Sequence, residues 1–249
     1  IEDLGGELLG GHTFETRNFV AKPYEFGMDI SLSVQGIIKN GKKPWKKNGL
    51  KSGDILLLSR PLGVGIIFAA QMQNINLFNS TNLVYESLRT SQQFLLDQIY
   101  QLQDNLGENI INAATDITGF GFIGHLKEMV KSSNLQRKSH NLNEIKAVLN
   151  LMSFNTYPNV MELIRKGVKS TLFDGNKKIY DEIIEKDFTQ REIIFDLDED
   201  LRIGKISDKI ELLLDPQTCG PLLISCKPKY EKYFKNNWYK VGRICDKDI

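Results

Sequence analysis

The stretch NAATDITGFGFIGHLKE runs from Asn112 to Glu128. An apolar approach ends at one carboxylate, Asp116, and three glycines then precede a helix-like run. This order predicts a strand, a loop and a helix. Glycines let the backbone turn with positive φ, and the first N–H groups of a helix can face an anion. Because a carboxylate repels a bare phosphate, the pattern favours a metal ion that bridges Asp116 to a phosphorylated ligand such as a magnesium nucleotide.

Two other interpretations of this stretch must be weighed. Gly119–Gly124 spells G-x-G-x-x-G, and Glu144 lies twenty residues further on, as in the dinucleotide fingerprint. Polar residues interrupt the expected strand, however, and Lys131–Asn143 is too polar for a second one, so the context argues against a nicotinamide site. Asp116 could also serve only as a loop or helix cap, and spacing alone leaves both roles open.

The composition is that of an ordinary globular protein. Of the 249 residues, 41% are hydrophobic and 25% are charged, and the formal net charge of +1 argues against nucleic acid or an anionic membrane as partner. No apolar run reaches the length of a membrane span, so we expect a cytoplasmic protein. The three cysteines form no C-x-x-C pair, which predicts reduced thiols. The chain begins at Ile1 without an initiator Met, so we expect it to be a piece of a longer protein.

Before the central stretch, the pattern changes near residue 40. Phe26–Ile38 alternates apolar and polar residues, which predicts a long half-buried antiparallel strand. Lys39–Asp54 holds three glycines, a proline and six lysines, so it is expected to be a solvated linker. After it we predict a buried strand at Ile55–Leu58, a helix at Ile66–Met72, and a long helix from an N-cap at Ser80 to about Leu102.

After the central stretch, the predicted elements are short and irregular. Strands and helices do not alternate steadily, which favours an α+β fold over a doubly wound sheet. The expected elements are a strand pair within Leu135–Val148, helices at Val160–Lys166 and Ile179–Glu185, strands at Ile210–Leu214 and Leu222–Cys226 around a tight turn, a helix at Pro228–Phe234, and a last strand at Val241–Ile244.

The remaining candidate residues give weaker signals. The sequence Gly10-Gly11-His12-Thr13 is either a tight turn or a ligand loop. His125, at the start of a helix, is expected to cap or pack, and His140 has no evident partner. No elbow motif surrounds any serine or cysteine, which disfavours nucleophilic catalysis within this chain.

Three segments taken together are more specific than any one of them. LLGGHT at Leu8–Thr13, ATDITGFGFIGHLKEM at Ala114–Met129 and DPQTCGPLLI at Asp215–Ile224 resemble signature segments of selenide, water dikinase, also called selenophosphate synthetase. LKSGDILLLSRPLGVGI at Leu50–Ile66 also resembles that family. The resemblance implies the C-terminal α+β domain of the aminoimidazole ribonucleotide synthetase-like fold in residues 41–249. Residues 1–40 would be the tail, with the last strand or strands, of a truncated N-terminal ATP-binding domain.

The resemblance also implies an activity. The family makes selenophosphate, AMP and phosphate from ATP, selenide and water, with magnesium ions that hold the polyphosphate. By that comparison Gly10, Gly11, His12 and Thr13 would lie at the ATP site, Asp116 would bind magnesium, and Gly119 and Gly121 would shape the adjoining loop. The resemblance further implies a homodimer. A fused upstream domain could precede the chain, which would be inactive alone because the family's reactive cysteine or selenocysteine lies upstream.

One departure and two alternatives accompany this resemblance. The family's last motif usually has Ser-Gly-Gly where this chain has Cys219-Gly220-Pro221. Cys219 does not stand in for the missing nucleophile. The chain could instead be a non-catalytic binding or dimerisation module of a larger fusion protein. A sister enzyme that activates a carbonyl oxygen with ATP fits the TDITGFGFIGH stretch less well.

Overall fold

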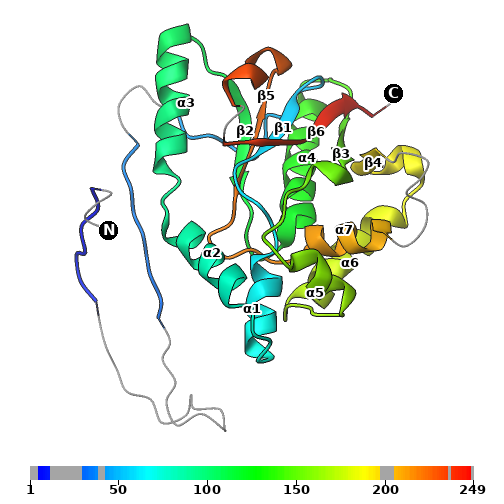
Figure 1. The fold of residues 1–249 in the computed structure, drawn as a ribbon. Helices are drawn as coiled ribbons and strands as arrows, with labels where there is room; N and C mark the ends of the chain where they lie inside the picture. Colours follow the sequence, from blue (N-terminus) through cyan, green and yellow to red (C-terminus); the bar gives the residue numbers. More distant parts are fainter. Residues whose placement is uncertain (1–4, 12–29, 39–42, 197–204, 235–236, 248–249) are drawn as a thin grey trace. The chain divides into compact units, whose positions relative to one another are not determined.

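The computed structural model describes residues 5–11, 30–38, 43–196, 205–234 and 237–247 (Figure 1). The chain divides into two compact units, Ile1–Pro44 and Trp45–Ile249, and all the helices and strands assigned in the described residues belong to the second. In that described part, no helix is both long and apolar enough to cross a membrane.

Six strands form one sheet in the second unit. They lie side by side in the order β2 (Ile111–Asp116), β5 (Leu222–Cys226), β1 (Ile55–Leu58), β6 (Tyr239–Asp246), β3 (Ile145–Asn150) and β4 (Ile193–Asp196). Neighbouring strands are antiparallel except β3 and β4, which are parallel. A mostly antiparallel sheet with helices packed on it is the α+β fold that the sequence predicts.

Apolar cores cover both faces of the central strand β1. Leu56 and Leu58 join the larger core, whereas Ile55 and Leu57 join a second core on the other face. All four positions are therefore apolar, because successive side chains of a strand point to opposite faces. The larger core includes residues of α1 (Val64–Met72), α4 (Gly121–Ser139), α5 (Val160–Arg165), α6 (Phe173–Ile184) and α7 (Lys205–Leu214), and the second includes residues of α3 (Gln93–Leu106).

Several predicted elements are confirmed. The central stretch is a strand, a loop and a helix, as β2 and α4, and the predicted strands at Ile55–Leu58, Leu222–Cys226 and Val241–Ile244 are β1, β5 and part of β6. The helices expected near residues 66, 160 and 179 are α1, α5 and α6, and Pro228–Tyr233 forms a 3₁₀ helix. Two further 3₁₀ turns lie at Leu151–Ser153 and Phe188–Gln190.

The prediction of a single long helix from Ser80 to Leu102 is wrong. The chain forms α2 (Phe78–Arg89) and then α3, because Thr90 is extended and the Ser91 hydroxyl accepts a hydrogen bond from the Gln93 amide at 3.1 Å. Ser80 lies inside α2 and not at its N-cap, and its hydroxyl donates to Asn159 Oδ1 at 2.6 Å.

Two predicted strands are also wrong. Ile210–Leu214 is the end of helix α7, since a short apolar run fits a buried helix as well as a buried strand. The polar part of Leu135–Val148 continues α4 to Ser139, and only β3 from Ile145 onward is a strand.

The predictions for the first fifty residues fare differently. Residues 30–38 form no strand, and Ile30 and Leu32 are each 73% exposed. An alternating sequence forms a strand only when a neighbouring strand pairs with it, and none of the described strands pairs with residues 30–38. Phe26–Asp29 lie outside the described residues. The expected solvated linker is wrong beyond Pro44: Leu50 is buried, and its amide donates to Ser133 Oγ at 3.2 Å.

Candidate functional site

Asp116 lines an open cleft of about 270 Å³ at one end of the sheet. The other walls come from the loop after β1, the joint between α2 and α3, and the loop between α7 and β5. Segments far apart in the sequence meet here because Asp116, the last residue of β2, pairs with Leu222, the first residue of β5. The polar lining residues are Arg60, Thr90, Ser91, Gln92, Asp116, Thr118 and Cys219.

Arg60 brings a positive charge to this cleft. Its guanidinium donates to the Cys219 carbonyl at 3.1 Å and to the Thr90 carbonyl. Partial burial lowers its pKa from the ordinary value. No carboxylate pairs with Arg60 among the described residues. Carbonyl oxygens orient the guanidinium without neutralising it, and sequence analysis did not identify this residue as part of the site.

Asp116 brings an opposite charge that is also uncompensated. Its side chain is exposed and has no hydrogen bond or ion pair among the described residues. No group of three His, Cys, Asp or Glu side chains in the described ranges could enclose a metal ion. One carboxylate nevertheless fits magnesium, which typically takes one or two protein carboxylates and completes its octahedron with phosphate oxygens and water.

The glycine loop after Asp116 is held by close backbone packing. Gly121 has φ of 64°, and a Cβ there would lie 2.8 Å from the Leu214 carbonyl oxygen. The Asn176 amide nitrogen donates to the carbonyls of Gly119 and Leu214, both at 2.9 Å. Gly121 is therefore required by the contact between this loop and α7, whereas a Cβ at Gly119 would meet only Leu172, at 3.8 Å.

His125 packs inside the site and does not line the cleft. It lies on α4, is 5% exposed, and its Nε2 accepts a hydrogen bond from the Thr118 amide at 3.1 Å. Burial lowers its pKa, and the Lys47 ammonium lowers it further, so the ring is neutral near pH 7. The expectation that His125 caps or packs agrees with this position. His140 is the residue that follows the last turn of α4.

The Asp215–Pro221 turn holds the first turn of α1. Gln217 Oε1 accepts hydrogen bonds from the amides of Gly63 at 3.1 Å and Val64 at 3.2 Å, and Asp215 Oδ2 accepts from Ile66 at 3.2 Å. These bonds occupy the otherwise unpaired N–H groups at the start of a helix. The sequence motif therefore has a structural role in this chain that its resemblance to a signature segment did not reveal.

Cys219 and Gly220 complete the cleft wall. Cys219 is exposed with φ of 45°, and it has no disulfide partner. Cys226 and Cys245 are also free thiols, and burial raises the pKa of Cys226 to about 12. The Pro221 carbonyl accepts a hydrogen bond from the Ile117 amide at 2.9 Å, so the departure from Ser-Gly-Gly keeps a backbone contact with the end of β2.

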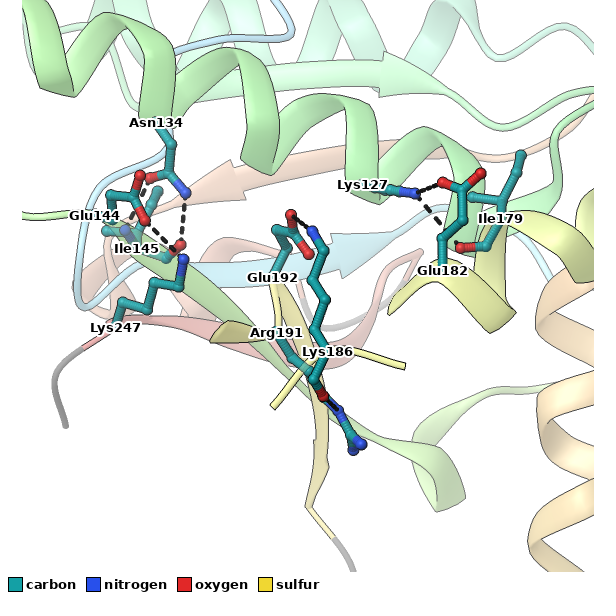
Figure 2. A network of polar contacts seen from close by, with 10 residues as sticks. All are labelled: Lys127, Asn134, Glu144, Ile145, Ile179, Glu182, Lys186, Arg191, Glu192 and Lys247. Carbon is teal, nitrogen blue, oxygen red and sulfur yellow. Dashed lines mark hydrogen bonds and ion pairs between the residues drawn. The ribbon is translucent and has the colours of Figure 1, made fainter. Parts of the chain in front are cut away.

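The dinucleotide interpretation gains no support from Glu144. Figure 2 shows its carboxylate paired with Lys247, at 2.7 Å, beside the Asn134 side chain, which bonds both backbone groups of Ile145. Glu144 thus joins the start of β3 to the residue that follows β6. Figure 2 also shows two separate ion pairs, Lys127 with Glu182 and Lys186 with Glu192.

The expected ATP-contacting segment belongs to the first unit. Gly10 and Gly11 are exposed, and a Cβ at either would meet nothing within 4 Å. His12 and Thr13 lie outside the described residues. The role assigned to these four residues stays a prediction.

Comparison with known proteins identifies the family. The family described as AIR synthase related protein, C-terminal domain, matches residues 51–248. The chain belongs to this family.

Individual members of known families that resemble the chain carry a more specific name. One, from Caldanaerobacter subterraneus subsp. tengcongensis, is named selenide, water dikinase and is 28% identical over 255 residues, covering 99% of the chain and 62% of the relative. Another of that name, from Pelobacter propionicus, is 31% identical and covers 92% of the chain and 53% of the relative. The chain thus spans little more than half the length of these relatives. A solved thiamine-monophosphate kinase from Stenotrophomonas maltophilia is 14% identical, with a TM-score of 0.47 over 81% of the chain and 50% of that protein, too distant to bear on function.

Proposed function

We propose that this chain is the C-terminal portion of a selenide, water dikinase. The whole protein would convert ATP, selenide and water to selenophosphate, AMP and phosphate. The relatives of that name cover nearly the whole chain, and this coverage supports the assignment. The portion would be inactive alone and would act within a cytoplasmic homodimer.

The observation that carries the proposal is a pair of opposite charges in one cleft. Asp116 and Arg60 both line it, yet they do not pair with each other or with any other charged side chain that the structure describes. A half-buried cation without an anion is costly unless a ligand compensates it. A magnesium-bound polyphosphate supplies both signs, a cation for Asp116 and phosphate oxygens for Arg60.

The protein residues then have distinct tasks. Asp116 would hold magnesium, and the bound ion would supply positive charge to the phosphates. Arg60, oriented by the Cys219 and Thr90 carbonyls, would bind phosphate oxygens. Gly10–Thr13 would contact ATP, across the interface of the homodimer.

An assay on the full-length protein tests this proposal. Asp116→Asn should lower the rate of selenophosphate formation, followed by ³¹P NMR, by at least about tenfold, because it removes a metal ligand. Asp97→Asn, on the exposed face of α3 and away from the cleft lining, is the matched control and should leave the rate unchanged. Equal rates for all three proteins would contradict the role of Asp116. Nucleotide-independent dimerisation without any selenophosphate would instead favour the binding module.

A further inference from the structure

Thr118 is fixed by hydrogen bonds from two different segments. Its amide donates to His125 Nε2 at 3.1 Å, and its carbonyl accepts from the amides of Gly121 and Gln217, both at 3.0 Å. Its hydroxyl oxygen lies 3.2 Å from the same His125 nitrogen. These bonds fix the backbone of Thr118 against both α4 and the 215–221 turn, and the hydroxyl contact with His125 orients its side chain.

The contact with the Thr118 amide determines the tautomer of His125. A ring nitrogen that accepts from an N–H group carries its lone pair, so in the neutral ring the proton is on Nδ1. Nδ1 is buried and has no hydrogen-bond partner among the described residues. A buried donor without a partner opposes folding, so a residue needed only for packing would be better replaced by an apolar one. Both printed hydrogen-bonding contacts of the His125 ring are made by Nε2, and both are with Thr118.

The same contact orients the Thr118 hydroxyl. Because Nε2 carries no proton, the 3.2 Å contact has the hydroxyl as donor, and the amide and the hydroxyl share the single lone pair of this nitrogen. The lone pairs of Oγ1 then point away from the ring. Thr118 is partly exposed and lines the cleft together with Asp116. An oxygen with free lone pairs in the same cleft as a carboxylate can serve as a ligand for a hard cation such as magnesium.

We propose that Thr118 Oγ1 is a second protein ligand, direct or through one water molecule, for the divalent cation that Asp116 binds, and that His125 is the positioning residue that aims it. This inference rests on the function proposed above. It adds a ligand to a site for which the described residues offer one carboxylate, and it assigns a task to a histidine that does not line the cleft. A histidine that only stabilised the loop would affect folding without changing the affinity for the cation.

The experiment measures binding of Mn²⁺, as a probe for magnesium, to the full-length protein in the presence of ATP by electron paramagnetic resonance. Thr118→Val should weaken binding about tenfold or more, whereas Thr118→Ser, which keeps the hydroxyl, should retain it. His125→Phe should behave like Thr118→Val. His125→Gln should recover binding, because its Oε1 can accept the Thr118 amide. Thermal unfolding of each variant identifies those that remain folded at the assay temperature.

The outcomes separate this inference from the function on which it rests. Wild-type binding by Thr118→Val, together with weak binding by Asp116→Asn, would overturn the inference and leave the proposed function intact. Wild-type binding by Asp116→Asn would overturn both. An independent measurement uses ¹⁵N-histidine NMR of the ligand-free protein, in which we expect the proton of His125 on Nδ1. A proton on Nε2 would overturn the inference whatever the protein binds.

Discussion

Gly220 shows how a single atom shapes the cleft. A Cβ at this position would lie 1.7 Å from the Ile117 carbonyl oxygen and 2.8 Å from the Gln217 Cβ. Both neighbours are fixed, since the Ile117 amide donates to Pro221 and the Gln217 amide to Thr118. The close approach of the 215–221 turn to the end of β2 therefore requires glycine.

We predict that Gly220→Ala lowers the free energy of unfolding by about 3 kcal/mol, because backbone must move to admit the methyl group. Urea unfolding of the chain measures this. Gly175→Ala is the matched control: Gly175 lies in α6, is exposed, and a Cβ there meets nothing within 4 Å. The control should gain about 0.5–1 kcal/mol from helix propensity. Equal stability of the two variants would mean that the turn lies further from β2.

Asp215 should make stability depend on pH. Burial raises its pKa to about 7, although hydrogen bonds from the Ile66 amide and the Gln217 side chain act in the opposite direction. The folded state therefore holds a proton that the unfolded state loses near pH 4, so stability falls as pH rises from about 4 to 7. The shift corresponds to a loss on the order of 4 kcal/mol. Measured by urea unfolding between pH 5 and 8, the wild type should lose more stability than Asp215→Asn, and parallel curves would contradict this.

Sequence reasoning found some site residues and not others. Asp116 stands out because it interrupts an apolar run just before a cluster of glycines. Arg60 and Asn176 do not, because each reaches the site through a contact with a segment distant in the sequence, Arg60 with Cys219 and Asn176 with Gly119. An isolated arginine or asparagine carries no local pattern from which such a contact could be predicted.

Among the elements, α1 depends on a residue far along the chain. It begins after Gly63, which has φ of 111°, and the first turn contains no acidic residue. Its N-terminal amides instead bond Gln217 and Asp215. Residues 60–65 and 215–221 therefore form one structural unit: the side chains of Gln217 and Asp215 accept the hydrogen bonds of the amides at the start of α1.

We predict that Gln217→Leu lowers the free energy of unfolding by about 2 kcal/mol or more, since it leaves the buried amides of Gly63 and Val64 unpaired. Thermal and urea unfolding measure the loss. Gln136→Leu, on the exposed side of α4, should change stability by less than about 0.5 kcal/mol. A similar effect of both substitutions would show that water replaces the lost acceptor.

The sequence predicts the helices and strands that have strong local signals. It does not predict those whose secondary structure depends on tertiary contacts. The strand, loop and helix around Asp116 are predictable because this stretch has both an apolar pattern and a cluster of glycines. The apolar end of α7 fits either state, and only its packing among α4, α5 and α6 selects the helix. The break between α2 and α3 follows from three polar residues, Thr90–Gln92, which helical spacing alone does not distinguish from a surface turn of a helix.

For the whole molecule, the boundary of the second unit falls at Trp45. Trp45 packs on Tyr100, with ring centroids 5.2 Å apart, and the Lys46 carbonyl accepts a hydrogen bond from Ala114 at 2.9 Å. The Lys47–Glu128 pair is exposed and contributes little. The lysines of this segment concealed its packing, because a charged, glycine-rich stretch resembles a linker in the sequence.

We predict that a chain of residues 45–249 melts at the temperature of the 249-residue chain. Removing five more residues, to begin at Leu50, should cost about 2 kcal/mol and lower the melting temperature by roughly 4–8 °C, because the Trp45 and Lys46 contacts are lost. Differential scanning calorimetry of the three chains checks this. Equal melting of all three would place residues 45–49 outside the folded unit.

The Lys46 carbonyl has a further consequence for solubility. β2 is an edge strand of the sheet, and an open edge offers unpaired backbone groups to any other chain. The Lys46 carbonyl accepts the hydrogen bond of the Ala114 amide on that edge. The positive charges of the neighbouring lysines also disfavour pairing of this edge with a second copy of the chain. A chain shortened past this point would present to its neighbours the strand that ends in Asp116. Self-association would then begin at the strand that carries the cleft, before the fold itself is lost.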